Sequence, residues 1–295
     1  GYGSSGFSGD GCTGVVRLDR RNGEIFIMRA DVLLVERGLC PSRQKAKEII
    51  LSGSAFADGT IIKKPSQEFP ENTIFTVDTN ALSLRYVGRG GQKLEGAIEK
   101  FGIAIKDTIC MDIGASTGGF TDCLLQHGAR YVYAVDVGHG QLAPKLLQDP
   151  RVLNLEGINV RDLNRKIVPE DMDFICSDVS FISLSHVFPA VTQFLKRDGQ
   201  AVFLIKPQFE AGKQNVGKHG IVRDPVVHQK VLTTVLSICK QERFSIFGLT
   251  YSPICGGDGN IEYLLYFGKQ GPSQTYTDVQ LKNLIQDAFQ FLKYQ

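Results

Sequence analysis

The segment Asp112–Asp122, DIGASTGGFTD, joins an apolar run to an expected helix through a turn of small residues. Gly114, Gly118 and Gly119 allow the backbone to approach a ligand closely, and a helix that begins at such a turn presents unpaired N–H groups and a positive dipole end. The sequence therefore predicts a ligand site where this strand ends. A nicotinamide cofactor is not expected, because Ser116 stands where the dinucleotide-binding pattern GxGxxG has its second glycine.

A second acidic residue, Asp136, lies near the end of the next apolar run, YVYAVDV, 24 residues after Asp112. A carboxylate at the tip of the second strand can accept hydrogen bonds from both ribose hydroxyls of a bound nucleoside, as it does in dinucleotide folds. Together with the glycine-containing loop, Asp136 predicts a ligand that contains adenosine but no pyrophosphate.

Two further charged residues close apolar runs, since Asp178 follows MDFICS and Lys206 follows AVFLI. In open α/β sheets ligands bind outside the carboxyl ends of the strands, so both residues are expected at the same edge as the loop. His139 and His219 have no partner carboxylate and no metal-ligand spacing, and they are expected to be surface residues or incidental RNA contacts.

The composition limits the class of protein. The 295 residues are 42% hydrophobic and 22% charged, with a formal net charge of +2, which is typical of a globular protein and excludes wholesale disorder, collagen and coiled coil. Seven cysteines are scattered without a CxxC pair or Cys/His spacing, so neither a disulfide framework nor a metal site is predicted, and a reducing cytoplasm is the expected location. No apolar run is long enough to span a membrane, and no signal-peptide pattern is found.

The residues that could do chemistry are set in alternating strands and helices beyond residue 91. This alternation predicts an α/β domain with a mostly parallel sheet and an antiparallel end. Strands are predicted at residues 108–114, 131–137, 152–157, 172–179, 200–207, 244–253 and 260–268, and helices at 92–101, 118–127, 224–241 and 277–295.

Residues 28–86 are predicted to form a small α+β module of two short helices followed by a hairpin. Asp31 is expected to cap the first helix and Ser42 the second, and Asp58-Gly59 is a tight-turn dipeptide. The order of these elements resembles the αL-type RNA-binding domain of a small-subunit ribosomal protein and of several RNA-modifying enzymes.

Two other segments delimit this module. Residues 1–27 are expected to be a disordered tail, with Met28 as a natural start, and residues 87–91 are glycine-rich and expected to act as a hinge. The outward basic face of the second helix is either a solvated surface or a phosphate-contacting one, and the resemblance favours the latter. The predicted RNA contacts are Arg29, Arg43, Lys45, Lys47, Lys63, Lys64 and Arg89.

The loop from Asp112 to Phe120 resembles that of the FtsJ-like ribose methyltransferases, which have an acid, a glycine, small residues and a glycine pair before an aromatic residue. From about Met28 the whole chain resembles the TlyA family, because RGGQKLEGA, DIGASTGGFTD, SDVSFISL, LIKPQFE and NIEYLLYF follow the small domain in order. Members of that family are two-domain enzymes that 2′-O-methylate cytidines in ribosomal RNA, and some carry the label hemolysin.

The resemblance implies that residues 92–295 form a Rossmann-like methyltransferase sheet with helices on both faces. The implied cofactor is S-adenosylmethionine, and the implied partner is ribosomal RNA, in assembled ribosomal subunits. The residues expected to bind the cofactor are Asp112, Gly114, Ala115, Ser116, Thr117, Gly118, Gly119, Phe120, Asp136, Val137 and Asn159.

The resemblance also implies a catalytic tetrad of Lys93, Asp178, Lys206 and Glu262. A ribose 2′-hydroxyl is a poor nucleophile at neutral pH, so a positioned base would assist its attack on a sulfonium methyl group. Lys206 is the candidate base, and Lys93 as a second cation, together with partial burial, would favour its neutral form. Asp178 and Glu262 would hold the two ammonium groups in place.

Alternative functions are weaker. Cys176 lies close to Asp178 but lacks the Pro-Cys dipeptide of pyrimidine-carbon methyltransferases, and SDVSF stands where an exocyclic-amine methyltransferase would have an Asn/Asp-Pro-Pro-aromatic string. A non-catalytic RNA-binding or ribosome-assembly protein stays open, whereas a hemolysin-type membrane-active protein has no pore segment to support it. The loop Phe209–Asp224 is either a lid over the target nucleotide or a long connection.

Overall fold

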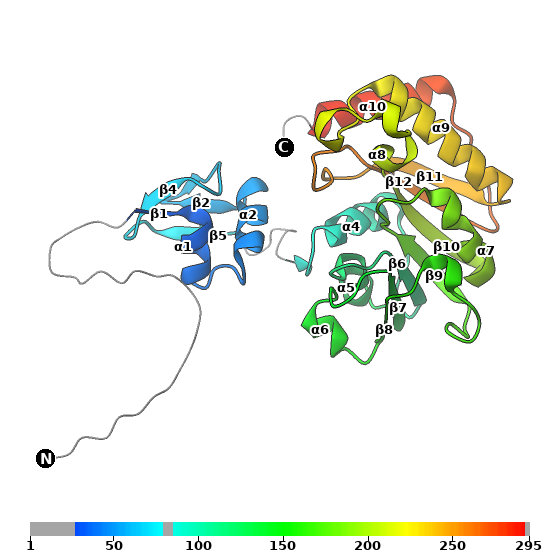
Figure 1. The fold of residues 1–295 in the computed structure, drawn as a ribbon, viewed down its shortest axis with the longest axis horizontal. Coiled ribbons are helices and arrows are strands. Elements are labelled where there is room, and N and C mark those ends of the chain that lie inside the picture. The colour runs from blue at the N-terminus through cyan, green and yellow to red at the C-terminus, as the bar shows by residue number, and fades with distance from the viewer. Residues whose placement is uncertain (1–26, 79–84, 293–295) are drawn as a thin grey trace, which may run out of the picture. The chain divides into compact units, whose positions relative to one another are not determined.

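The computed structural model of the chain describes residues 27–78 and 85–292. The chain divides into two compact units, residues 1–77 and 78–295 (Figure 1). The tail predicted at residues 1–27 lies outside the described residues, except for Ile27, which opens the first strand.

Within its described residues, the first unit combines two helices with two small sheets. The helices are α1 (Ala30–Glu36) and α2 (Arg43–Leu51). Strand β1 (Ile27–Arg29) pairs antiparallel with β4 (Glu68–Pro70), and the other sheet has the order β3 (Thr60–Ile61), β2 (Ala55–Ala57), β5 (Phe75–Val77). Both helices bury aliphatic side chains between them and the strands, so the predicted α+β organisation is confirmed.

Local details of this unit agree with the sequence in two places and differ in one. The Ser42 side chain accepts a hydrogen bond from the Lys45 N–H and caps α2 as predicted, and Asp58-Gly59 turns the chain between β2 and β3 with positive φ at both residues. Asp31 does not cap α1. It is fully buried in the first turn, where its carboxylate binds Arg29 Nε at 2.9 Å and Arg43 Nη2 at 3.2 Å.

The basic face of α2 is also smaller than expected. Lys45 is nine-tenths buried, with its Nζ 3.4 Å from Glu48 Oε2, so its predicted outward orientation is wrong. The reason is helical periodicity, because Lys45 shares the buried side of α2 with Ala46 and Ile49 rather than the side of Arg43. Lys63 and Lys64 are exposed, and Lys47 is half-buried.

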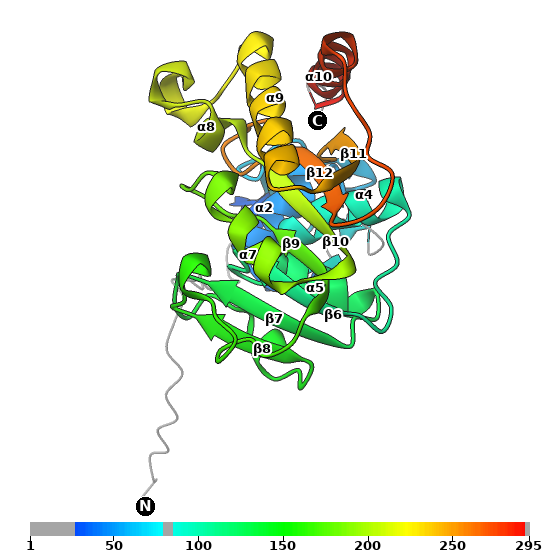
Figure 2. The same cartoon turned by 90° about the vertical axis from the view of Figure 1, so that its right-hand side faces the viewer.

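The second unit is built on a seven-stranded sheet of order β11-β12-β10-β9-β6-β7-β8, whose strands are all labelled in Figure 2. Neighbouring strands from β8 to β10 run parallel, and β12 runs antiparallel to both β10 and β11. The strands are β6 (Ile109–Ile113), β7 (Tyr131–Asp136), β8 (Val152–Glu156), β9 (Met172–Ser177), β10 (Leu195–Ile205), β11 (Ser245–Tyr251) and β12 (Tyr263–Gly268). The predicted mostly parallel sheet with an antiparallel end is confirmed.

Helices cover both faces of this sheet. Side chains alternate along each strand, so Met111 of β6 packs in the core formed with α7, α9 and α10, whereas its neighbour Cys110 packs in the core formed with α4, α5 and α6. The helices are α4 (Gly90–Phe101), α5 (Gly119–Gln126), α6 (Pro144–Leu147), α7 (Phe188–Phe194), α8 (Pro207–Glu210), α9 (Pro225–Gln241) and α10 (Asp278–Leu292). Helix α7 is not among the predicted elements, because it is too short to show a clear helical period in the sequence.

The predicted hinge at residues 87–91 is built into the second unit. The backbone N–H of Val87 donates to Asp122 Oδ2 at 2.8 Å, and α4 already begins at Gly90. The chain here lies so close to the start of α5 that a Cβ atom on Gly119 would be 2.9 Å from the backbone nitrogen of Gly91. These residues therefore do not form a free hinge, because hydrogen bonding and backbone packing hold them against α5.

We expect Gly119→Ala to lower the free energy of unfolding of the second unit by about 1–3 kcal/mol, because the added methyl group overpacks the contact between two backbones. Gly257→Ala is the matched control, since a Cβ there meets no atom within 4 Å. Urea denaturation followed by far-UV circular dichroism compares the two variants. Equal stability of Gly119→Ala and the wild type would show that the close approach is not required.

Candidate active site

Two adjoining cavities lie at the carboxyl edge of the sheet. The larger, of about 690 Å³, is lined by the ends of β6 and β7 and by the segments that follow β8 and β9. The smaller, of about 190 Å³, is lined by the loop after β6, by Gly90 and by Lys206. Both are lined by Gly114, Ser116, Asp178 and Ser180, so a ligand in the larger cavity can reach the smaller one.

The loop after β6 needs its first glycine for steric reasons. Gly114 has φ +87°, and a Cβ atom at this position would lie 2.8 Å from the carbonyl oxygen of Asp178. The loop thus crosses directly over the end of β9, as the small residues of its sequence predict. Ala115, Ser116, Thr117, Gly119 and Phe120 line the smaller cavity, whereas Gly118 is covered by Leu142 and Leu146 and lines neither cavity.

Asp136 lies at the end of β7 and lines the larger cavity. Its Oδ2 accepts a hydrogen bond from the Ser116 N–H at 2.8 Å, and its Oδ1 accepts one from the Gly138 N–H at 2.7 Å. The same carboxylate therefore orders the loop and faces the cavity. Val137 and Asn159 also line this cavity, and the Asn159 side chain caps the short helical turn Val160–Asp162.

Asp112 does not face either cavity. It is fully buried behind the loop, where its Oδ2 accepts hydrogen bonds from the Thr121 N–H at 2.9 Å and the Thr121 hydroxyl at 2.7 Å. Burial raises the pKa of this carboxyl to about 7, although the bonds to Thr121 oppose the shift. Asp112 thus holds the first turn of α5 in place, while its predicted direct contact with a ligand stays a prediction.

The four residues of the predicted tetrad lie next to one another, and two of them, Asp178 and Lys206, line the smaller cavity. Lys93 of α4 lies with its Nζ 2.6 Å from Glu262 Oε2 and 3.7 Å from Asp178 Oδ2. On the other side of Asp178, its Oδ1 is 2.6 Å from the Nζ of Lys206. The result is a line of alternating charges in the order Glu262, Lys93, Asp178, Lys206.

All four side chains are largely enclosed, which strengthens their mutual attraction. The side chains of Lys93 and Glu262 are 8% and 2% exposed. Burial by itself would lower the pKa of Lys93, but the carboxylates of Asp178 and Glu262 outweigh it and raise the pKa. Lys93 is therefore held as a cation, consistent with a positioning role.

The structure adds residues that the sequence did not single out. Ser180 accepts a hydrogen bond from Lys206 Nζ at 2.9 Å, and Phe181 beside it is 91% exposed with φ +65°. Glu210 of α8 accepts hydrogen bonds from the Ser183 hydroxyl and the Leu184 N–H, both at 2.8 Å, and so braces this loop. All of these residues lie within the motifs SDVSFISL and LIKPQFE, and their position in these motifs is the sequence feature that could have identified them.

Three other predicted features have a defined place in the structure. Cys176 is fully buried within β9 and burial raises the pKa of its thiol well above the ordinary value, which is unsuitable for a nucleophile. Arg89 donates from Nη2 to the Cys255 carbonyl at 3.1 Å. The end of the loop Phe209–Asp224 is anchored by Asn260, which lies outside the loop. The Asn260 side chain donates a hydrogen bond to the Gly220 carbonyl and accepts one from the Val222 N–H.

Comparison with known proteins agrees with this architecture. Residues 86–269 match the FtsJ-like methyltransferase family, and residues 28–74 match the S4 domain. The chain is 45% identical over 269 residues to YqxC, a candidate rRNA methyltransferase of Bacillus subtilis, covering 90% of this chain and 95% of that protein. It is 43% identical over 242 residues to the 16S/23S rRNA (cytidine-2′-O)-methyltransferase TlyA of Mycobacterium tuberculosis, covering 82% of this chain and 90% of the relative.

A solved structure is also similar over nearly the whole chain. It is that of a hemolysin candidate from Streptococcus thermophilus, with a TM-score of 0.71 and 41% identity, covering 92% of this chain and 98% of the other. Among the residues that the structure describes, no helix is both long and apolar enough to cross a membrane.

We expect Asp112→Asn to reduce the pH dependence of stability. The carboxyl has a pKa of about 7 in the folded protein and an ordinary value of about 3.9 when unfolded, so its contribution is complete below about pH 4 and is lost as the pH rises through 7. Urea denaturation at pH 5 and pH 8 should show a smaller loss of stability in the variant than in the wild type. The exposed Asp198→Asn should keep the wild-type loss, and an unchanged loss in Asp112→Asn would contradict the assignment.

Proposed function

Because the chain belongs to the TlyA family of FtsJ-like methyltransferases, we propose that it transfers a methyl group from S-adenosylmethionine to the 2′-hydroxyl of a cytidine ribose in ribosomal RNA. The observation that carries this proposal is the line of ion pairs from Glu262 to Lys206, which ends at a cavity that adjoins a larger one of about 690 Å³. The Mycobacterium tuberculosis relative carries the same reaction in its name.

The cavities fit the cofactor. Asp136 and Asn159 line the larger cavity, where they can accept and donate hydrogen bonds to a ribose and an adenine, and Val137 offers apolar contact. The backbone from Ala115 to Thr117 and Gly119 lines the smaller cavity, where it can hold the amino-acid end. The bound cofactor supplies an electrophilic sulfonium methyl group. Asp112 and Gly118 would act only by shaping the loop.

Lys206 is the proposed general base. It lies at the smaller cavity, nine-tenths buried, where it forms an ion pair with Asp178 and donates a hydrogen bond to the Ser180 hydroxyl. To accept the 2′-hydroxyl proton it must first be neutral, and Asp178 Oδ1 at 2.6 Å is the nearest group to which its ammonium proton can pass. Lys93 lies 3.7 Å from the other oxygen of Asp178 and is itself paired with Glu262, so all four residues would serve one proton transfer.

The first unit is proposed to dock on folded RNA. Lys63 and Lys64 are exposed and take part in none of this unit's ion pairs among the described residues, and Lys47 is half-buried. Arg29 and Arg43 remain partly exposed while sharing Asp31, so their phosphate contacts would compete with this carboxylate. A ribosomal RNA substrate, in assembled subunits, would place the protein in the cytoplasm.

Two other functions are less well supported. A non-catalytic RNA-binding role would leave the buried line of charges without a purpose, since removing it would spare the protein a desolvation cost. A membrane-active role is suggested by the name of the Streptococcus thermophilus structure. No helix among the described residues of this chain could span a membrane to support such a role.

We expect Lys206→Ala to lower methyl transfer by at least about 100-fold, the lower end of what a general base contributes, while cofactor binding stays within a few-fold. Purified ribosomal subunits are incubated with methyl-labelled S-adenosylmethionine, and the RNA is hydrolysed in alkali. Because a 2′-O-methyl group blocks cleavage of the adjoining phosphodiester, label should remain in alkali-resistant dinucleotides. Lys240→Ala, an exposed lysine on α9, is the control and should keep full activity.

Three results would contradict this proposal in whole or in part. Label in single nucleotides would mean methylation of a base rather than of ribose, and full activity of Lys206→Ala would remove Lys206 as the base. No label in any subunit, with the cofactor bound, would favour the non-catalytic role.

We expect the double variant Lys63→Ala/Lys64→Ala to bind ribosomal RNA more weakly, because each lysine that neutralises a phosphate releases counterions. The slope of log affinity against log salt concentration should become shallower by about 1 for each lysine–phosphate pair that the substitutions remove. Cofactor affinity should not change, and Lys240→Ala again serves as the control. An unchanged salt dependence would remove these lysines from the RNA-binding surface.

A further inference from the structure

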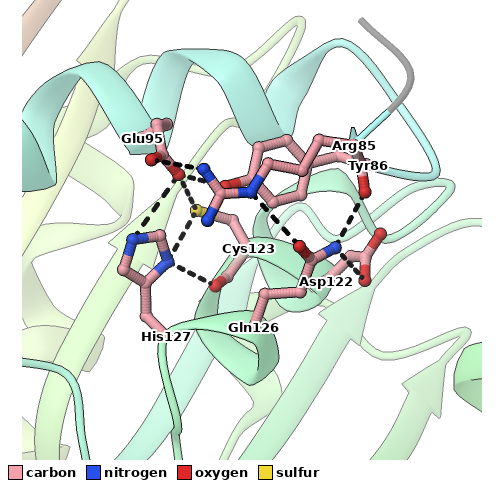
Figure 3. Close-up of polar contacts among 7 residues, drawn as sticks. All are labelled: Arg85, Tyr86, Glu95, Asp122, Cys123, Gln126 and His127. Atoms are coloured by element: carbon pink, nitrogen blue, oxygen red, sulfur yellow. Dashed lines mark hydrogen bonds and ion pairs between the residues drawn. The ribbon is translucent and has the colours of Figure 1, made fainter. Parts of the chain in front are cut away.

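Glu95, Cys123 and His127 form a polar cluster between helices α4 and α5 (Figure 3). Cys123 and His127 lie one turn apart on α5, and Glu95 reaches them from α4. Cys123 is fully buried, Glu95 is 3% exposed, and the His127 side chain is 22% exposed, so one side of the cluster opens to solvent. None of the three lines either cavity of the proposed active site.

The donor atoms have the separations of a metal-ligand set. Cys123 Sγ lies 3.8 Å from Glu95 Oε2, and His127 Nε2 lies 3.5 Å from the same oxygen. One donor atom from each residue can be chosen so that all three lie within 4.8 Å of one another. Tetrahedral zinc, with bonds of about 2.0 Å to nitrogen or oxygen and 2.3 Å to sulfur, separates its ligand atoms by roughly 3.3–3.6 Å.

Neighbouring groups orient these donors. His127 Nδ1 is hydrogen-bonded to the Cys123 carbonyl at 2.9 Å, which turns Nε2 toward Glu95. Arg85 Nη1 donates to Glu95 Oε1 at 2.9 Å, and this leaves Oε2 directed at the other donors. Such outer partners are typical of metal sites, because they fix the ring tautomer and the direction of the carboxylate. The Tyr86 hydroxyl also contacts Glu95 Oε2.

We propose that Glu95, Cys123 and His127 bind one zinc ion, with the Tyr86 hydroxyl or a water molecule in the fourth position. A thiolate, an imidazole and a carboxylate form a ligand set that zinc accepts readily. The ion would join α4, which carries Lys93, to α5, which begins at the ligand-binding loop. Its role is structural, because the cluster lies outside both cavities.

Zinc binding must displace the thiol proton. Without an ion, burial raises the pKa of the Cys123 thiol, so the residue is protonated. Coordination forms a zinc–sulfur bond and releases that proton to solvent, because a metal-bound thiol is deprotonated.

This site could not be predicted from the sequence. Cys123 and His127 are four residues apart, but no second pair of metal-ligating residues stands near them in the chain, and Glu95 lies 28 residues before Cys123. Because the chain shows no recognisable ligand spacing, the sequence predicts no metal site. Only the packing of α4 on α5 brings the third donor to the other two.

The test measures metal content and binding in the full chain. Protein purified without chelator should contain about one zinc per chain by mass spectrometry. After removal of the metal by chelator, cobalt(II) chloride should produce a thiolate-to-cobalt charge-transfer absorption, and zinc chloride should raise the melting temperature. Cys123→Ala and His127→Gln should abolish all three responses. Cys239→Ala, another fully buried cysteine, is the matched control and should retain them.

His127 is partly exposed, so His127→Gln is expected to fold even if Cys123→Ala does not, and circular dichroism checks both. The absence of a cobalt charge-transfer band and of any zinc-dependent change in melting temperature in the wild type would overturn the proposal. Undiminished binding by the folded His127→Gln variant would also overturn it. None of these measurements depends on methyl transfer, so failure of the proposed function would not affect the outcome.

Discussion

The burial of two lysines at one edge of the sheet is the constraint around which the second unit is organised. A buried ammonium group is costly unless a carboxylate accompanies it, and removing one partner of a buried pair typically costs about 3–5 kcal/mol. Lys93 and Lys206 therefore require Glu262 and Asp178. Lys93 lies on α4 and Lys206 just after β10, whereas Glu262 lies just before β12 and Asp178 just after β9. The charges can pair only if the sheet order and its antiparallel end are correct.

The loop between β6 and α5, residues 114–118, depends on this arrangement, because it crosses the strand end that leads to Asp178. Gly114 passes within contact of the Asp178 backbone, and Asp136 hydrogen-bonds the loop from the other side. Asp112 holds the start of α5 at the expense of an unfavourably buried carboxyl. The loop conformation is thus maintained from three strands, and Asp178 of the tetrad lines both cavities beside this loop.

Residues 85–87, near the start of the second unit, are held against helices α4 and α5. Arg85, Tyr86 and Val87 contact Glu95 or Asp122, residues of α4 and α5 that lie outside both cavities. Helix α4 therefore connects this segment to Lys93, and α5 connects it to the loop. A zinc ion between the two helices would make this connection stiffer, because it would replace hydrogen bonds with coordinate bonds.

The amino-acid sequence contained enough information to predict the order of most strands and helices, the glycine loop and the family resemblance, which in turn indicated four charged residues that the structure brings together. These features are local, because they depend on hydrophobic periodicity, turn residues and short motifs. Tertiary packing decided the rest. It buried Asp31 and Lys45, turned Asp112 away from the cavity, and incorporated residues 87–91 into the second unit. It also brought Glu95 to Cys123 and His127, because contacts between residues far apart in the chain leave no periodic trace in the sequence.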